Sequence, residues 1–169
     1  DMDNATDAWA VDISTVYYPG FKELETLRLT MSVRNFGPEV QLAGTYRDYD
    51  DGQLLDEDTE FKLFPLPLTF EFGLAMDPVK TDLHRLTFAV VGVHPNDNGE
   101  RLNLGTEYMF RNMFALRGGY IVNHDTRGFS AGLGTALSLL DMAKVKLDYG
   151  YAHYGVLEDV QYISLTFDW

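Results

Sequence analysis

The sequence predicts an all-β fold, an antiparallel transmembrane β-barrel, from three observations. Apolar and polar residues alternate with a period of two in nine segments, the pattern of strands with one apolar and one polar face. Most segments run for about 8–11 residues, closer to the ~9–11 of a membrane-barrel strand than to the ~5–6 of an average globular strand. Aromatic residues make up 14% of the chain and gather near the segment ends, as in the interfacial girdles of membrane barrels.

The alternation is clearest in 27–34, 68–76 and 144–151, and in 161–169, which ends on Trp169. Leu86 to Val93 is apolar on both faces and is the weakest of the set. Between the strands, short turns alternate with longer connections, which predicts periplasmic turns at 19–26, 77–82, 111–113 and 139–142 and a long outward loop at 37–67. The nine predicted strands are 9–17, 27–34, 68–76, 86–93, 102–110, 114–122, 129–137, 144–151 and 161–169.

Charged residues inside the strands share the less hydrophobic face. In a barrel they would point into one lumen and pair across neighbouring strands, either to hold the shape and restrict leakage or to line a substrate path. In a soluble sandwich or a lipocalin-like barrel the apolar face would instead turn inward, and the alternation alone does not choose. The candidate lumen network is Asp12, Arg28, Arg34, Glu71, Glu107, Arg117, Lys144, Lys146 and Asp148.

Composition excludes several functions. The net charge of -13 argues against nucleic-acid binding, and the absence of cysteine excludes a disulfide framework or a thiolate site. No apolar stretch approaches the roughly 20 residues of a spanning helix, and no histidine shows metal-ligand spacing. A G-x-S-x-G match at 128–132 lies inside a predicted strand, whereas a nucleophile elbow needs a strand, a turn and a helix. We therefore predict no catalytic residue, cofactor or metal, and no enzyme.

Four short segments carry a family resemblance. His94, Pro95, Asn96, Asp97 and Asn98 begin a stretch that continues through Tyr108 and resembles the HPNDN-x-ER-x-N-x-G-x-EY motif of the PorV/PorQ family. The same family's motifs are similar to 117–120 (RGGY), 32–38 (SVRNFGP) and 64–68 (FPLPL), in the same order. The resemblance spans about 11–169, most of the chain.

The resemblance implies a bacterial outer-membrane barrel similar to the FadL long-chain fatty-acid transporters, with 14 strands. The nine strands would then be the C-terminal portion of one barrel domain covering 1–169 and continuing outside it. Some family members are components of the type IX secretion system, which implies a structural or partner-binding role. The alternative is a FadL-like channel for hydrophobic small molecules. The expected partners are the lipid bilayer, other secretion-system proteins or secreted cargo, and a hydrophobic solute.

Two outward segments could make contacts. The Asn-Asp-Asn-Gly run from Asn96 is a turn sequence, and we interpret it as a structural turn, with ligand or partner contact as the alternative. The loop at 37–67 holds seven acids between residues 48 and 60 whose spacing does not fit an EF-hand. We interpret it as a solvated loop, with loose divalent-cation binding or contact with a basic protein partner as the alternatives. These candidate contacts are Asp48, Asp50, Asp51, Asp56, Glu57, Asp58 and Glu60.

Overall fold

The computed structural model describes residues 6–50, 53–123, 126, 128–139, 143–155 and 158–168. These residues form eleven β-strands and no α-helix. Accordingly, no described helix has the length and apolar character needed to cross a membrane. Trp169, the aromatic residue that ends the last predicted strand, lies outside the described residues.

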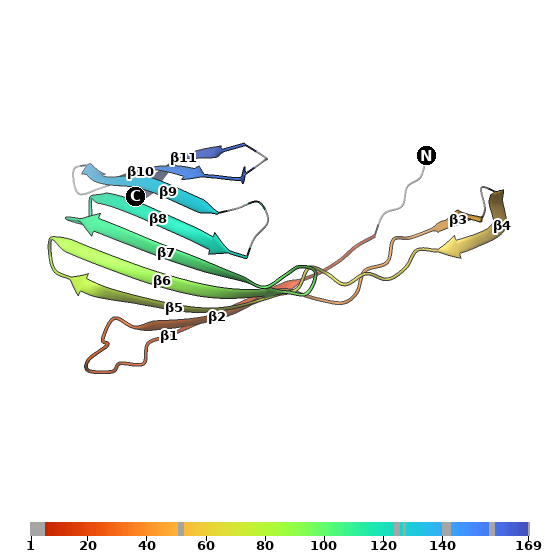
Figure 1. Ribbon diagram of the computed structural model, residues 1–169, viewed down its shortest axis with the longest axis horizontal. Coiled ribbons are helices and arrows are strands. Elements are labelled where there is room, and N and C mark those ends of the chain that lie inside the picture. The colour runs from red at the N-terminus through yellow and green to blue at the C-terminus, as the bar shows by residue number, and fades with distance from the viewer. Residues whose placement is uncertain are drawn as a thin grey trace.

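Nine strands form one antiparallel sheet in the order β1-β2-β5-β6-β7-β8-β9-β10-β11 (Figure 1). Apart from the detour between β2 and β5, each strand pairs with its neighbour in sequence, so the topology is a meander. The strands are β1 (Val11–Tyr17), β2 (Arg28–Phe36), β5 (Thr69–Lys80), β6 (His84–Pro95), β7 (Arg101–Phe110), β8 (Phe114–Val122), β9 (Phe129–Leu139), β10 (Ala143–Ala152) and β11 (Val160–Asp168).

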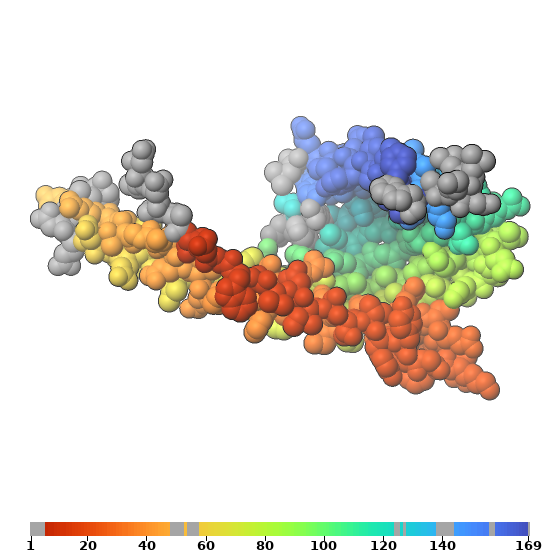
Figure 2. Space-filling model, turned by 180° about the vertical axis from the view of Figure 1, so that it is seen from behind, coloured from red at the N-terminus to blue at the C-terminus, as the bar shows by residue number. Residues whose placement is uncertain are grey.

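The detour is a two-stranded ribbon, β3 (Thr45–Asp50) and β4 (Gln53–Glu60), which pair only with each other among the described residues. We call residues 37–67 the arm. It projects well beyond one end of the sheet (Figure 1), and the space-filling view shows it standing clear of the sheet (Figure 2). The predicted loop is therefore a β-hairpin arm. We call the sheet end that bears it the arm rim and the opposite end the turn rim.

All nine predicted strands of the sheet are confirmed; 114–122 has the predicted bounds, and the bounds of the other eight differ. The largest correction concerns 77–82, predicted as a turn, because Asp77 and the next three residues extend β5 to Lys80. A β-bulge between Met76 and Val79 interrupts the alternation there and hid this extension. The closed barrel is not formed by these residues: β1 and β11 lie at opposite edges, and the sheet is open.

The register aligns all the apolar faces on one side of the sheet. Every strand of the sheet contributes at least one large, exposed apolar side chain to this apolar face: Ile13, Met31, Phe72, Val90, Leu104, Leu116, Leu133, Leu147 and Leu165. The buried residues of the described sheet lie instead on the opposite, polar face: Gly73, Asp77, Val93, Pro95 and Ala115. The polar face is thus the enclosed one, the reverse of a soluble sandwich.

The strands are strongly tilted relative to the rims. One row of register partners starts at Tyr17, the last residue of β1, and ends at Phe129, the first residue of β9. The row passes through Leu29, Leu74, Val90, Leu104 and Tyr120. The row therefore runs from the turn rim to the arm rim. It crosses six inter-strand spacings of roughly 4.8 Å while it moves along the strands by roughly eight residues of about 3.3 Å each. The strands are thus tilted by about 40° from the direction that joins the two rims. Barrel strands tilt by about 35–45°.

The chain exposes far more surface than a compact protein of its size. Its accessible area is 13024 Å² for a mass of 19.2 kDa. A compact monomer of that mass exposes about 8,400 Å². The excess follows from a sheet of one layer, because among the described strands none packs on either face of it.

Candidate functional site

Arg117 on β8 is the centre of an ion-pair network on the polar face. Its Nε donates to Glu107 Oε2 on β7 at 2.7 Å, and its Nη1 donates to Asp148 Oδ1 on β10 at 2.5 Å. Because β9 separates β8 from β10, the guanidinium must pass over β9 at Gly134. A Cβ at Gly134 would stand 2.5 Å from Asp148 Oδ1 and 2.9 Å from Arg117 Nη1. The glycine therefore makes the three-strand bridge possible, and Arg85 Nη2 extends it at 3.5 Å from Glu107 Oε1.

A second cluster surrounds Asp77, whose side chain is the least exposed among the described ion pairs, at 6%. Its Oδ1 accepts from Arg28 Nη2 at 2.5 Å and from the Thr87 hydroxyl at 2.8 Å. The Thr26 hydroxyl accepts a hydrogen bond from the Asp77 backbone N–H at 2.9 Å and donates one to the Asp77 carbonyl oxygen at 3.0 Å. The cluster joins β2, β5 and β6 next to the β5 bulge.

Other members of the predicted network form smaller pairs. Glu71 Oε2 accepts from Arg34 Nη2 at 2.8 Å and from Ser32 Oγ at 3.0 Å, and Lys146 Nζ donates to Asp168 Oδ2 at 2.6 Å. The remaining two predicted members are Asp12 on the edge strand β1 and Lys144 on β10, next to the other edge. Asp12 Oδ1 accepts from the Asn35 N–H at 2.8 Å, and Lys144 is the register partner of Asp168. The nine predicted residues thus lie in several clusters and not in one.

Sequence reasoning missed Asp77 and Arg85 because both were placed outside a strand. Arg85 lies one residue before the predicted strand 86–93, and Asp77 lies in the predicted turn 77–82, whereas the structure places them in β6 and β5. Both residues occupy the same alternate positions as the other charges of the polar face. Continuing the alternation past the predicted strand ends would therefore have found them.

The turn motif that begins at His94 fastens the arm to the sheet. Asn96 donates from its backbone N–H to Leu68 O at 2.9 Å and from Nδ2 to Leu66 O at 3.0 Å. His94 Nδ1 lies 3.0 Å from Glu100 Oε1 across the turn, and the Asn98 side chain caps the Gly99 N–H at 2.7 Å. Pro95 is buried and Asp97 is exposed. These contacts are those of a structural turn.

Further bonds stiffen the base of the arm. Val40 and Phe64 exchange two backbone hydrogen bonds of 2.9 Å, and Gln41 Nε2 donates to Phe61 O at 2.6 Å. Gly37 lies against the Trp9 carbonyl, where a Cβ would collide. Hydrogen bonds therefore join the two sides of the arm at its base, before the β3–β4 ribbon begins at Thr45.

Six of the seven predicted acidic contacts fall on the two strands of the arm. Among them, the structure describes only the side chains of Asp58 and Glu60, both exposed. Asp51 lies outside the described residues, and the side chains of Asp48, Asp50, Asp56 and Glu57 are not described. Arg47 Nε donates to Asp58 Oδ1 at 3.2 Å on one face, while the Tyr46 and Phe61 rings pack 5.1 Å apart on the other.

A second histidine–carboxylate pair lies at the arm rim. His153 Nδ1 lies 2.7 Å from Asp159 Oδ1, across the connection between β10 and β11. Hydrogen bonds from the Tyr151 hydroxyl and then from His153 lower the pKa of the Asp159 carboxyl. The carboxylate thus stays charged to lower pH than usual and holds both sides of the connection.

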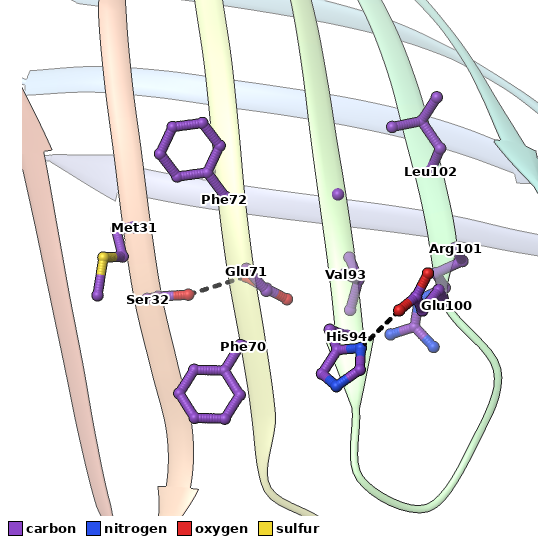
Figure 3. Close-up of a pocket in the computed structure, with 11 residues that line it drawn as sticks. Met31, Ser32, Phe70, Glu71, Phe72, Val93, His94, Glu100, Arg101 and Leu102 are labelled. Carbon is purple, nitrogen blue, oxygen red and sulfur yellow. Dashed lines mark hydrogen bonds and ion pairs between the residues drawn. The ribbon is translucent and has the colours of Figure 1, made fainter.

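The apolar face has a shallow hollow over Gly92. Phe72 and Leu102 are its register partners on the flanking strands, and Phe70 and Met31 complete the wall (Figure 3). Its volume is about 530 Å³. The His94–Glu100 pair lies at its arm-rim end (Figure 3). The hollow suits hydrocarbon with a polar group at one end.

Within the described residues, no three histidine, aspartate or glutamate side chains are grouped to hold a metal ion. Comparison of the chain with protein-family models, with curated proteins and with solved structures finds no match.

Proposed function

We propose that this chain forms part of the wall of a bacterial outer-membrane β-barrel of the PorV/PorQ type, acting in type IX protein secretion as a structural and partner-binding component. The observation that carries the proposal is the inverted polarity of the sheet. Large apolar side chains stand uncovered on one face, and the charged network occupies the enclosed face. In lipid this arrangement is stable, because the bilayer covers the apolar face and the lumen receives the charges.

The dimensions of the sheet support a bilayer setting. Strands of about ten residues at about 3.3 Å each, tilted by about 40°, give an apolar band about 25 Å tall, the height expected of a membrane barrel. Aromatic side chains lie at the turn rim, where the Arg111 guanidinium stacks over Phe110 and His84 bonds the Tyr108 hydroxyl at 2.7 Å. Such amphipathic rings suit the headgroup level.

The polar face supports a wall that resists leakage more than an open path. Arg117 pairs with carboxylates on β7 and β10, and Asp77 Oδ1 accepts hydrogen bonds from two donors. Charges satisfied by one another contribute little free binding capacity to a solute.

The arm supports partner binding. Residues 37–67 hold eight acidic and two basic side chains, so the ribbon carries six of the thirteen net negative charges. Its base is fixed by backbone bonds, so the charge is held at a defined place beyond the rim. A basic surface on a secretion partner or cargo is the complementary chemistry, and its affinity weakens with salt.

The test replaces residues 45–60 with a short Gly-Ser linker and keeps the Val40–Phe64 bridge. We expect unchanged membrane levels and loss of secretion and of partner co-purification. A second variant, Asp58→Asn with Glu60→Gln, keeps the ribbon and should weaken capture most at low salt. Partner capture that persists in both variants would contradict the role of the arm.

A second candidate function is a FadL-like channel for hydrophobic small molecules. The hollow over Gly92 lies on the lipid-facing side of the wall, where it would serve as a lateral site for such a molecule. Gly92→Leu fills the hollow, and Gly105→Leu, on the polar face of the next strand, is its control. If the channel function holds, Gly92→Leu lowers uptake of a hydrophobic dye while arm deletion does not. A soluble lipocalin-like barrel is disfavoured, because the apolar face is not the enclosed one.

A further inference from the structure

The ribbon of the arm, β3 with β4, is a sheet of only two strands. Among the pairings of the described residues, β3 pairs with β4 alone, and the ribbon stands clear of the nine-stranded sheet (Figure 1, Figure 2). A two-stranded hairpin alone in water is marginally stable and gains from a third strand. The Arg47–Asp58 ion pair adds little to the ribbon, because both side chains are exposed. The arm therefore presents backbone edges that a strand from a partner would stabilise.

The two edges of the ribbon differ in regularity. Arg47 on β3 is the register partner of Asp58 on β4. Two residues later on β3, Tyr49 is the partner of Leu54, which lies four residues before Asp58 on β4. The extra residues of β4 form a bulge, and a bulge interrupts the edge that a further strand would need. The outer side of β3 (Thr45–Asp50) is therefore the edge suited to a further strand.

The sequence of β3 defines the kind of strand that fits beside it. Tyr46, Asp48 and Asp50 occupy alternate positions along β3, so these three residues share one face of the ribbon. In an antiparallel strand, the residues opposite them follow in the reverse order. Opposite charges placed across from one another stabilise a strand pair, and so does an apolar residue across from an aromatic one. The complementary segment therefore has two basic residues and then an apolar one, at every second position from its N-terminal end.

Charge decides between a second arm and a different protein as the occupant of this edge. Residues 37–67 hold eight acidic and two basic side chains, so two arms side by side would repel each other. We propose that β3 accepts an extended basic segment of a partner protein as a third, antiparallel strand. The inference rests on the proposed function, in which the arm binds a basic partner, and assigns the edge and the mode of binding. Backbone hydrogen bonds to β3 supply affinity, and the alternate side chains select the segment.

The absence of cysteine from these 169 residues allows the edge to be located by disulfide trapping in the full chain. The probe is the synthetic peptide acetyl-Thr-Lys-Thr-Lys-Thr-Val-Cys-Thr-amide, whose cysteine falls opposite Thr45 when its lysines fall opposite Asp50 and Asp48. Thr45→Cys is the test variant, and Thr59→Cys on β4 is the matched control, because both threonines are exposed. A strand added to β3 lies about 4.8 Å from β3 and about 9.6 Å from β4, whereas a disulfide needs Cα atoms within about 7 Å of each other.

We expect Thr45→Cys to be trapped by the peptide under mild oxidation and Thr59→Cys to stay at the background of the unmodified chain. Trapping of neither variant, or equal trapping of both, would overturn the proposal.

The backbone contribution is tested with two further peptides, one N-methylated at its threonines and the other at its lysines and valine. Because the N–H groups of a strand point alternately to its two sides, strand addition predicts that only one of these peptides loses affinity, by at least about tenfold in fluorescence anisotropy. Equal affinity of the two methylated peptides would overturn strand addition and leave the proposed function standing, since attraction between charges alone would explain the binding. Peptide binding that survives replacement of residues 45–60 by the Gly-Ser linker would overturn both, because the arm would then not be the binding element.

Discussion

An arginine introduced at Leu147 tests which face of the sheet meets lipid. Leu147 is near the middle of β10, has an exposed fraction of 46%, and lies between its register partners Leu165 and Thr135. Ala143, the nearer end of β10, is four residues away. At a tilt of about 40° that distance is about 10 Å of depth, more than an arginine side chain spans in snorkelling to the interface.

The expected penalty is therefore about 2–4 kcal/mol, the cost of arginine at the midplane of a barrel's lipid face. That is a loss of about 30- to 700-fold in the folding equilibrium constant. Two matched variants separate face from depth. Ser164→Arg lies on the polar face opposite Asp148 and should change stability by about 1 kcal/mol or less. Phe167→Arg lies on the apolar face one residue from the end of β11 and should cost about 0–1 kcal/mol for the charge.

The assay is equilibrium unfolding of the full chain from phospholipid vesicles in guanidinium chloride, followed by tryptophan fluorescence. Equal penalties at Leu147 and Ser164 would refute the assignment of the two faces. Equal charge penalties at Leu147 and Phe167, after correction with alanine variants, would refute lipid contact, because a protein core has no such depth gradient.

Three further outcomes follow from the network and the rim. Arg117→Met leaves the carboxylates of Glu107 and Asp148 close together on the polar face without their shared cation. It should destabilise the sheet by about 1–3 kcal/mol in the same unfolding assay, with Arg117→Lys intermediate. Asn96→Ala removes one of the bonds that hold the arm and should speed limited proteolysis within 37–67 without changing the unfolding midpoint of the sheet by more than about 1.5 kcal/mol. The lowered pKa of Asp159 means that its contribution is present above the carboxyl's ordinary pKa and is lost as the pH falls through the lowered value. Protection from hydrogen exchange in the β10–β11 connection, taken relative to the intrinsic exchange rate at each pH, should therefore fall on acidification in the wild type and should stay constant with pH in Asp159→Asn.

The sheet could be predicted because the strand period and the apolar content agree along most of its length. The Glu107–Arg117 pair could also be inferred, since a tight turn at 111–113 places these residues opposite one another. The bridge from Arg117 to Asp148 could not, because it depends on two successive registers and on the space left by Gly134. No local pattern in one strand carries that information.

The arm was predicted as a loop for a different reason. Acidic residues dominate β3 and β4, and aspartate and glutamate are poor strand formers, so no alternation is visible there. Tyr46 and Phe61 lie side by side on one face of the ribbon only because the register of the hairpin brings them together. Loop length was the better signal, since loops of more than about 12–15 residues without structure of their own are uncommon.

Two observations together show that the charged face of the sheet is the less exposed one: the alternation of apolar and polar residues along the strands, and the exposure of each face in the structure. Alternation alone gives two faces and does not say which is interior. The structure adds that Asp77 is 9% exposed on the charged face, while Leu165 is 55% exposed on the apolar one. A sheet folded for water would reverse that assignment, since covering apolar area stabilises by about 25 cal/mol per Å² and leaving a charge enclosed without partners costs several kcal/mol. Here Asp77 is paired with Arg28, whereas the apolar face lacks a cover among the described residues. In the proposed function, the hydrocarbon of a lipid bilayer supplies that cover.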